Sequence, residues 1–180
     1  MEKKQNGNST LRNITITAIC IAMCVLLPIL FHFIPQGGRI FSPMHIPVLI
    51  CGLACSWQYG LICGAVGVIL SSAITSMPAL AQVPAMAVEC AVYGLASALL
   101  IKFIKTGKPY ADLYLSLICS MILGRIAGGA VQALFLTNGY TFSAWISGYF
   151  AVSLPGILLH LILVPPIVRA LTRAGLIAEK

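Results

Sequence analysis

The chain of 180 residues is 59% hydrophobic and only 8% charged, and its mean hydropathy is +0.99. Soluble domains carry about a quarter charged residues, so this composition excludes an ordinary soluble fold. The apolar residues fill nearly the whole length, and a spanning helix takes roughly 20 of them. The sequence therefore predicts an all-α membrane protein with one domain of six transmembrane helices over residues 1–180.

The net charge of +7 comes from basic residues that flank the apolar segments. An excess of Lys and Arg in such segments marks the cytoplasmic side of a membrane. We therefore expect both termini in the cytoplasm, residues 1–12 as a short cytoplasmic tail, and a multi-pass protein of the cell membrane. No basic groove alternates with aromatic residues, so nucleic acid is not an expected partner. The three clusters are Lys3, Lys4 and Arg12, then Lys102, Lys105 and Lys108, then Arg169, Arg173 and Lys180.

In chain order, the predicted helices cover residues 13–34, 47–56, 60–76, 84–104, 112–136 and 143–173. The second is barely long enough to cross a membrane, and the last is interrupted by Pro155 and by Pro165-Pro166. Outer loops are predicted at 35–47, 77–84 and 136–143. WQYG at 57–60 is predicted as a tight inner turn, and 102–112 as a basic inner connection.

Two opposite charges, Glu89 and Arg125, lie inside these apolar segments. An ionisable group at that depth costs several kcal/mol or more unless it is paired or faces a wet cavity. On its helix Arg125 lies within about 20° of Gln132, with glycines on nearby flanks. Tyr93 follows Glu89 by one turn. This arrangement favours an outward-facing cavity, and a buried ion pair is the alternative.

The last helix carries a second stripe of polar and aromatic residues, which spans an arc of about 80°. The stripe indicates a cavity wall, although an interfacial aromatic belt would by itself explain Trp145. His160 is deep enough to be a structural histidine. The stripe consists of Trp145, Tyr149, Ser153, Gly156 and His160.

Small residues lie one turn apart on two helices, at Ala18 and Ala22 and at Gly60 and Gly64. Such pairs let helices approach closely, and internal packing is the expected use of the glycines. Seven cysteines lie mostly in apolar runs without metal-ligand spacing, so we interpret them as packing residues. No catalytic motif is present, and we expect no enzyme activity, metal or cofactor.

The chain resembles the substrate-binding S component of an energy-coupling factor (ECF) vitamin transporter. The resemblance rests on six helices in a chain of this size, on Ala18-xxx-Ala22, on the stretch FSPMHIPVLICGLACSWQYGLICGAVG and on the GRxxGG run around Arg125. It extends over residues 12–174. Many members carry Gly-Pro where this chain has Cys55-Ser56.

The resemblance implies a subunit that captures a vitamin from outside, with a transmembrane coupling subunit and two ATPase subunits as partners in the bilayer. It implies that Ala18 and Ala22 form the face that docks on the coupling subunit. It also implies a pocket near the outer surface with the loop 35–47 as its lid. The candidate binding residues are then Glu89, Arg125, Gln132, Tyr93, Asn138, Trp145, Tyr149 and His45.

The substrate stays open between two kinds of vitamin. An Arg125 grip on a carboxylate favours pantothenate, because arginine binds a carboxylate in bidentate fashion, with Gln132, Tyr149 and Asn138 offered to hydroxyls and amides. The chain also bears a general likeness to the pantothenate-type members of the family, which implies the same substrate. A neutral or basic vitamin or precursor, such as pyridoxine or hydroxymethylpyrimidine, would instead bind Glu89. A structural membrane subunit without a ligand is the rival outside this class.

Overall fold

The computed structural model describes residues 2–31, 33–135 and 141–177, with side chains from Ser9 onward. Every regular element in these ranges is helical, as predicted. The long helices are α1 (Glu2–Leu30), α4 (Trp57–Thr75), α5 (Val83–Phe103), α6 (Pro109–Phe135) and α8 (Leu154–Arg173). The short elements are α2 (Gly37–Phe41), α3 (His45–Ala54), a 3-10 turn (Leu80–Gln82), α7 (Phe142–Ile146) and a π-helical turn (Ser147–Ala151).

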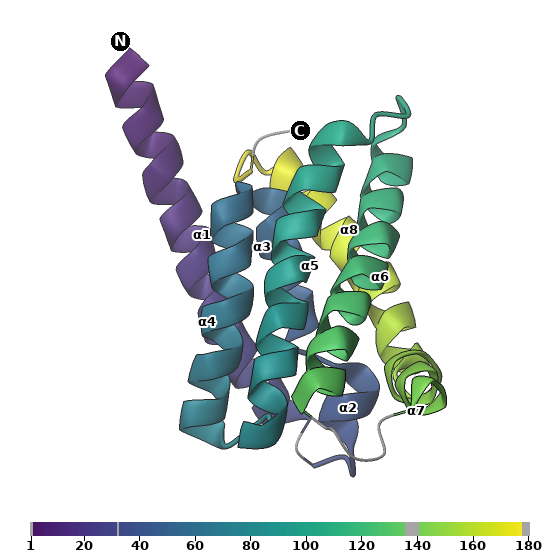
Figure 1. Cartoon of the computed structure of the whole chain (residues 1–180). Helices are drawn as coiled ribbons and strands as arrows, with labels where there is room; N and C mark the ends of the chain where they lie inside the picture. The colour runs from purple at the N-terminus through teal and green to yellow at the C-terminus, as the bar shows by residue number, and fades with distance from the viewer. Residues whose placement is uncertain (1, 32, 136–140, 178–180) are drawn as a thin grey trace.

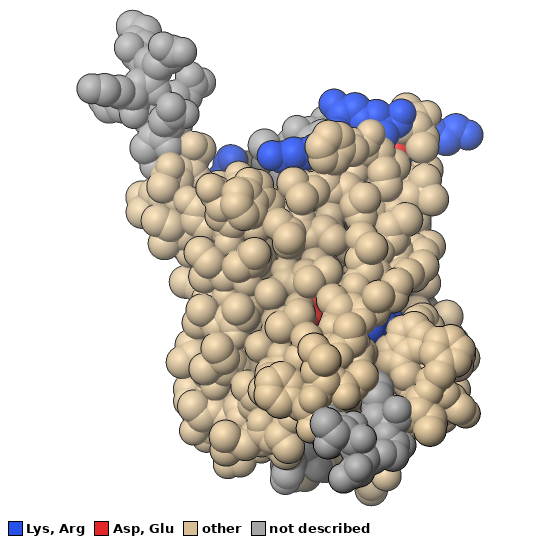
Figure 2. All heavy atoms as spheres, in the orientation of Figure 1, with Lys and Arg blue, Asp and Glu red and all other residues tan. Residues whose placement is uncertain are grey.

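Five helices in the described ranges are long and apolar enough to cross a membrane. The chain is therefore a multi-pass helical membrane protein. These helices lie side by side in a bundle, with the start of α1 and the end of α8 at the same end (Figure 1). Lys and Arg side chains gather at that end of the visible face (Figure 2). The candidate spans are Ser9–Leu30, Trp57–Thr75, Leu80–Phe103, Pro109–Phe135 and Leu154–Arg173.

The helix α3 is too short to be a span of its own. Its 10 residues extend for about 15 Å, half the thickness of a bilayer core. All of them are buried, since α3 packs against α1, α4, α5 and α8. The return from α1 to α4 therefore runs through α2, the segment 42–44 and α3 together (Figure 1).

The prediction of an outer loop over residues 35–47 is corrected, because the segment contains α2 and the start of α3 and is buried in the bundle from Ser42 onward. Irregular backbone at membrane depth must be buried in protein or line a cavity, and its polar groups need partners. The Ser42 N–H donates to the Gly38 carbonyl at 3.0 Å, and the Ser42 carbonyl accepts from the His45 N–H at 3.0 Å. That carbonyl also lies 3.2 Å from His160 Nε2. The break is thus hydrogen-bonded from within the protein.

Three further boundaries were wrong. The first helix, predicted over residues 13–34, is α1, which begins at Glu2 within the predicted tail 1–12 and ends at Leu30. WQYG is the first turn of α4, and the chain turns just before it at Cys55 and Ser56, which have extended backbone angles. Gly60 lies within α4, and its backbone lies directly against that of Gly94 on α5, where a side chain would collide. The last predicted helix is divided into α7, the π-helical turn and α8, with Pro155 in the first turn of α8.

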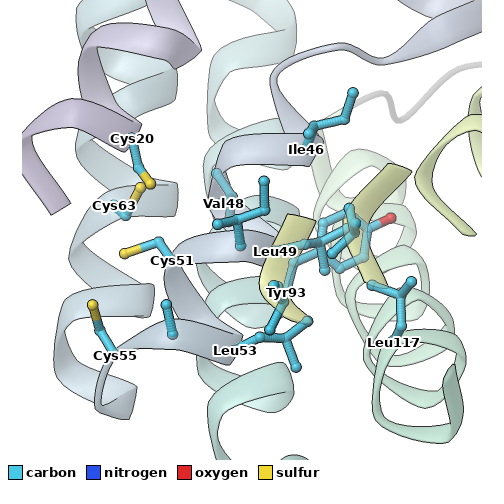
Figure 3. Packing of buried hydrophobic residues seen from close by; sticks show 14 of the residues in the cluster. Cys20, Ile46, Val48, Leu49, Cys51, Leu53, Cys55, Cys63, Tyr93 and Leu117 are labelled. Atoms are coloured by element: carbon cyan, nitrogen blue, oxygen red, sulfur yellow. The ribbon is translucent and has the colours of Figure 1, made fainter. Parts of the chain in front are cut away.

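The core confirms the packing interpretation of Gly60 and Gly64. A Cβ on either glycine would strike the backbone of α5, at Gly94 and Cys90 respectively. Buried cysteines of α1, α3 and α4 lie in the contact between these helices, and Figure 3 shows Cys20 and Cys63 pointing toward one another. Small residues therefore let α3 lie between the longer helices.

Candidate functional site

A cavity of about 590 Å³ lies at the α2 end of the bundle, away from the basic end. A volume of this size suits a small ligand. The end of α1, the segment 34–45, the α4–α5 connection, α5, α6 and the region 144–153 all contribute to it. Five of the predicted site residues line it, namely His45, Glu89, Arg125, Gln132 and Tyr149.

Arg125 is 2% exposed, and partners from two sides orient its side chain. Its Nη1 donates to Ser153 Oγ at 2.7 Å, and the Ser153 hydroxyl donates in turn to the Tyr149 carbonyl. The guanidinium lies 5.5 Å from the centre of the Phe150 ring, within range of a cation–π contact. The π-helical turn and the start of α8 thus hold a cation at the cavity with neutral partners.

Glu89 is 5% exposed and is held separately from Arg125. The Tyr93 hydroxyl, one turn along α5, donates to Glu89 Oε1 at 2.6 Å. No ion pair joins Glu89 to Arg125 in the part of the chain that the structure describes. Tyr93 itself is fully buried and lies behind Glu89, outside the set of cavity-lining residues.

The glycines that flank Arg125 on α6 make room for site residues of α5. A Cβ at Gly124 would collide with the Tyr93 ring. A Cβ at Gly128 would lie 2.8 Å from the Glu89 Cβ and 3.2 Å from its Oε2. The GRxxGG run therefore positions the Glu89–Tyr93 pair as well as supplying Arg125.

The stripe on the last helix divides between the cavity and the core. The Tyr149 hydroxyl donates to Gln132 Oε1 at 2.9 Å, which links two predicted site residues. Trp145 lies beside the cavity lining, where its ring fills the space left by Gly129 and its Nε1 donates to the Arg125 carbonyl at 3.2 Å. Its direct contact with a ligand stays a prediction.

The two buried histidines lie next to one another, and His45 lines the cavity whereas His160 does not. The His45 ring packs edge-on against Tyr93 with a centroid separation of 4.9 Å, and the His160 ring lies 5.6 Å from His45. Both nitrogens of His45 are enclosed without a hydrogen-bond partner among the described residues. His160 is bonded to the Ser42 carbonyl and does not line the cavity, which agrees with a structural histidine.

Arg39 lines the cavity as an exposed residue of α2, and sequence reasoning did not include it in the site. The sequence feature that could have identified Arg39 as a site residue is an arginine in a segment otherwise poor in charge. With Arg39 at the rim and Arg125 inside, the cavity has two guanidinium groups against the one carboxylate of Glu89. Its charge balance therefore favours an anionic ligand.

Two other predictions concern positions away from the cavity lining. Ala18 and Ala22 are exposed on the outer face of α1, where no other described helix covers them. Asn138 falls within residues 136–140, outside the described ranges, so its candidate role stays a prediction.

The fold and the cavity define a multi-pass helical membrane protein with a cavity at one end that charged, polar and apolar residues line together. A family model described as ECF transporter, substrate-specific component, matches residues 12–168, and the chain belongs to this family. It is therefore a substrate-binding subunit of an ECF importer, which also contains transmembrane and ATPase subunits, and this is not an enzyme family. No curated protein and no solved structure matches the chain.

Proposed function

We propose that this S component captures a water-soluble vitamin that bears a carboxylate, with pantothenate as the first candidate. The observation that carries the proposal is the Arg125 guanidinium, which borders the cavity with neutral partners and no acidic one in the described residues. A buried arginine binds a carboxylate strongly because the two planar groups form paired, charge-assisted hydrogen bonds. Gln132 and Tyr149 lie on the same cavity and offer further hydrogen bonds to amides and hydroxyls.

We place the protein in the cell membrane as a single domain with six crossings and both termini in the cytoplasm. The second crossing would be the composite of α2, the segment 42–44 and α3. This orientation agrees with the basic residues at the end opposite the cavity (Figure 2), because Lys and Arg are retained on the cytoplasmic side. The cavity would then face outward, as capture of an external vitamin requires.

A second candidate is a neutral or basic vitamin or precursor, such as pyridoxine or hydroxymethylpyrimidine. The Glu89 carboxylate on the cavity favours it, since it can accept from ring N–H or hydroxyl groups. A ligand-free structural subunit is disfavoured, because the ion pair that it would require between Glu89 and Arg125 is absent from the described contacts.

Calorimetry of the purified chain against a panel of water-soluble vitamins tests the proposal. We expect pantothenate to bind and Arg125→Ala to weaken it by roughly 100-fold or more, the loss of charge-assisted bonds from a buried group. Arg173→Ala, an exposed arginine at the opposite end of the bundle, is the matched control and should leave affinity unchanged. Unchanged affinity in a folded Arg125→Ala protein would exclude the carboxylate grip.

A further inference from the structure

Arg125 and Glu89 border one cavity, yet each is held by a neutral partner of its own. Ser153 Oγ accepts from Arg125 Nη1 at 2.7 Å, and the Tyr93 hydroxyl donates to Glu89 Oε1 at 2.6 Å. Opposite charges at membrane depth attract strongly, and an unpaired one costs several kcal/mol or more. Within the described contacts, the residues around Glu89 and Arg125 therefore keep the two charges from pairing.

The packing on α6 maintains this separation. The Glu89 side chain lies against Gly128 and the Tyr93 ring against Gly124, in spaces that a Cβ would occupy. The Tyr93 ring is also enclosed by the edge-on His45 ring. Glu89 is thus held in its position by its own helix and by α6, while Arg125 is held from the region 149–153.

We propose that the bound ligand bridges the two charges, with its anionic group on Arg125 and a hydroxyl or N–H donor at its other end on Glu89. The proposal rests on the proposed function, and it narrows the substrate class to molecules that carry both groups. A carboxylate has about four acceptor positions, so the bond from Tyr93 leaves Glu89 able to accept from a ligand. Tyr93, which does not line the cavity, is then a positioning residue for Glu89.

The bridge also predicts which ligands are rejected. A second anionic group in place of the donors would face Glu89 and be repelled by it. A ligand without an anionic group would leave the Arg125 charge uncompensated. Selectivity should therefore depend on both ends of the molecule.

Three probe molecules distinguish the contribution of the carboxylate end of the ligand from that of the hydroxyl end. Pantothenate carries a carboxylate and two hydroxyls, panthenol has a hydroxymethyl group in place of the carboxylate, and N-(3,3-dimethylbutanoyl)-β-alanine lacks both hydroxyls. Calorimetry should show that Glu89→Leu weakens pantothenate by roughly 10- to 100-fold and leaves the analogue without hydroxyls unaffected or better bound. Arg125→Gln should also weaken pantothenate by a large factor, but the probe that it leaves almost unchanged should be panthenol, which has no carboxylate to lose. Such crossed effects measure direct coupling between residue and ligand group.

The positioning role of Tyr93 has its own readout. Tyr93→Phe keeps the ring beside Gly124 and removes the hydroxyl that holds Glu89. We expect the preference for pantothenate over the analogue without hydroxyls to fall by about 10-fold, because Glu89 loses its orientation. Tyr114→Phe, an exposed tyrosine on α6, is the matched control and should leave that preference unchanged.

The outcomes distinguish the bridge from the proposed function. If Glu89→Leu weakens all three probes equally, or none, the bridge is wrong while the Arg125 grip stands. Should Glu89→Leu fail to fold, Glu89→Gln tests the same point, with a smaller loss of pantothenate affinity in the same direction.

If the wild-type chain does not bind pantothenate, the first-candidate substrate is wrong, and the Glu89 and Arg125 variants are tested on the panel vitamin that binds. Lower affinity for that vitamin in both variants would then support the bridge, and lower affinity in one variant or in neither would overturn it. A wild-type chain that binds no vitamin would overturn both proposals.

Discussion

The two arginines of the cavity differ in how deeply they are buried. Arg125 is 2% exposed and fixed by Ser153, whereas Arg39 is an exposed residue of the α2 rim. A buried, oriented guanidinium determines how tightly a ligand is held, and an exposed one mainly attracts it from solution. We therefore propose separate uses for the two arginines in capture, with Arg125 as the one that defines affinity.

Gly128 provides a test of the site at the scale of a single atom. A Cβ added there would lie 2.8 Å from the Glu89 Cβ, closer than real side chains pack. We expect Gly128→Ala to displace Glu89, to lower vitamin affinity by about 10-fold and to cost about 1–3 kcal/mol of stability, as overpacked sites do. Calorimetry and thermal unfolding of the purified protein measure the two effects.

Ala130→Val is the control for that substitution, since Ala130 is an exposed residue of the same helix. It should change neither affinity nor stability appreciably. Equal affinity of Gly128→Ala and wild type would mean that Glu89 tolerates displacement and does not contact the ligand.

At the scale of elements, α1 is the long helix with the least protein around it. Only 22% of its most apolar window is buried inside the chain, against 50% for the span that contains α5. Ala18 and Ala22 are exposed on it, one turn apart, and small residues at this spacing allow another helix to approach closely. The ECF partner subunits supply a reason for such a face.

We expect Ala18→Trp and Ala22→Trp to block vitamin uptake by the complete ECF complex and to leave binding by the isolated chain unchanged. The bulky ring would hold a partner helix away from α1, whereas the cavity is lined by α1 only from Pro28 onward and not by Ala18 or Ala22. Uptake of labelled vitamin into cells, compared with calorimetry on the purified variants, measures both.

Ala73→Trp on α4 is the matched control, because Ala73 is likewise an exposed alanine of a spanning helix. It should leave uptake intact. Normal transport by both α1 variants would show that the docking face lies elsewhere.

The same elements show what the sequence could and could not predict. Hydropathy located α4, α5 and α6 closely, because each is a continuous apolar run bounded by proline or polar residues. It did not reveal that 35–47 enters the bundle, since the burial of Ser42 and Pro43 depends on α8 and on His160. Helix faces brought Arg125, Gln132 and Tyr149 to one cavity. The partners of Gly124 and Gly128 could not be predicted, because they lie on another helix at a depth and rotation that only tertiary packing determines.

At the scale of the whole molecule, the path of the chain places the two ends of the described chain and the cavity at opposite ends of the bundle. The start of α1 and the end of α8 lie together at the basic end, and the cavity lies at the other (Figures 1 and 2). The six crossings proposed above would bring both ends to one side, with the composite of α2, residues 42–44 and α3 as the passage that α3 alone is too short to make. Protein around that composite replaces the lipid that its broken backbone could not face.

Reporter fusions test this orientation. We expect a fluorescent reporter that matures only in the cytoplasm to be active at the C-terminus and when inserted after Gly107, an exposed turn between α5 and α6. A reporter active only outside should work when inserted after Ala79, in the exposed connection between α4 and α5. The physical reason is the retention of Lys102, Lys105 and Lys108 on the cytoplasmic side. If the cytoplasmic reporter were active at only one of these two positions, Gly107 and the C-terminus, the number of crossings between them would be odd. The passage from α6 through α7 and α8 would then not return the chain across the membrane as an even count requires.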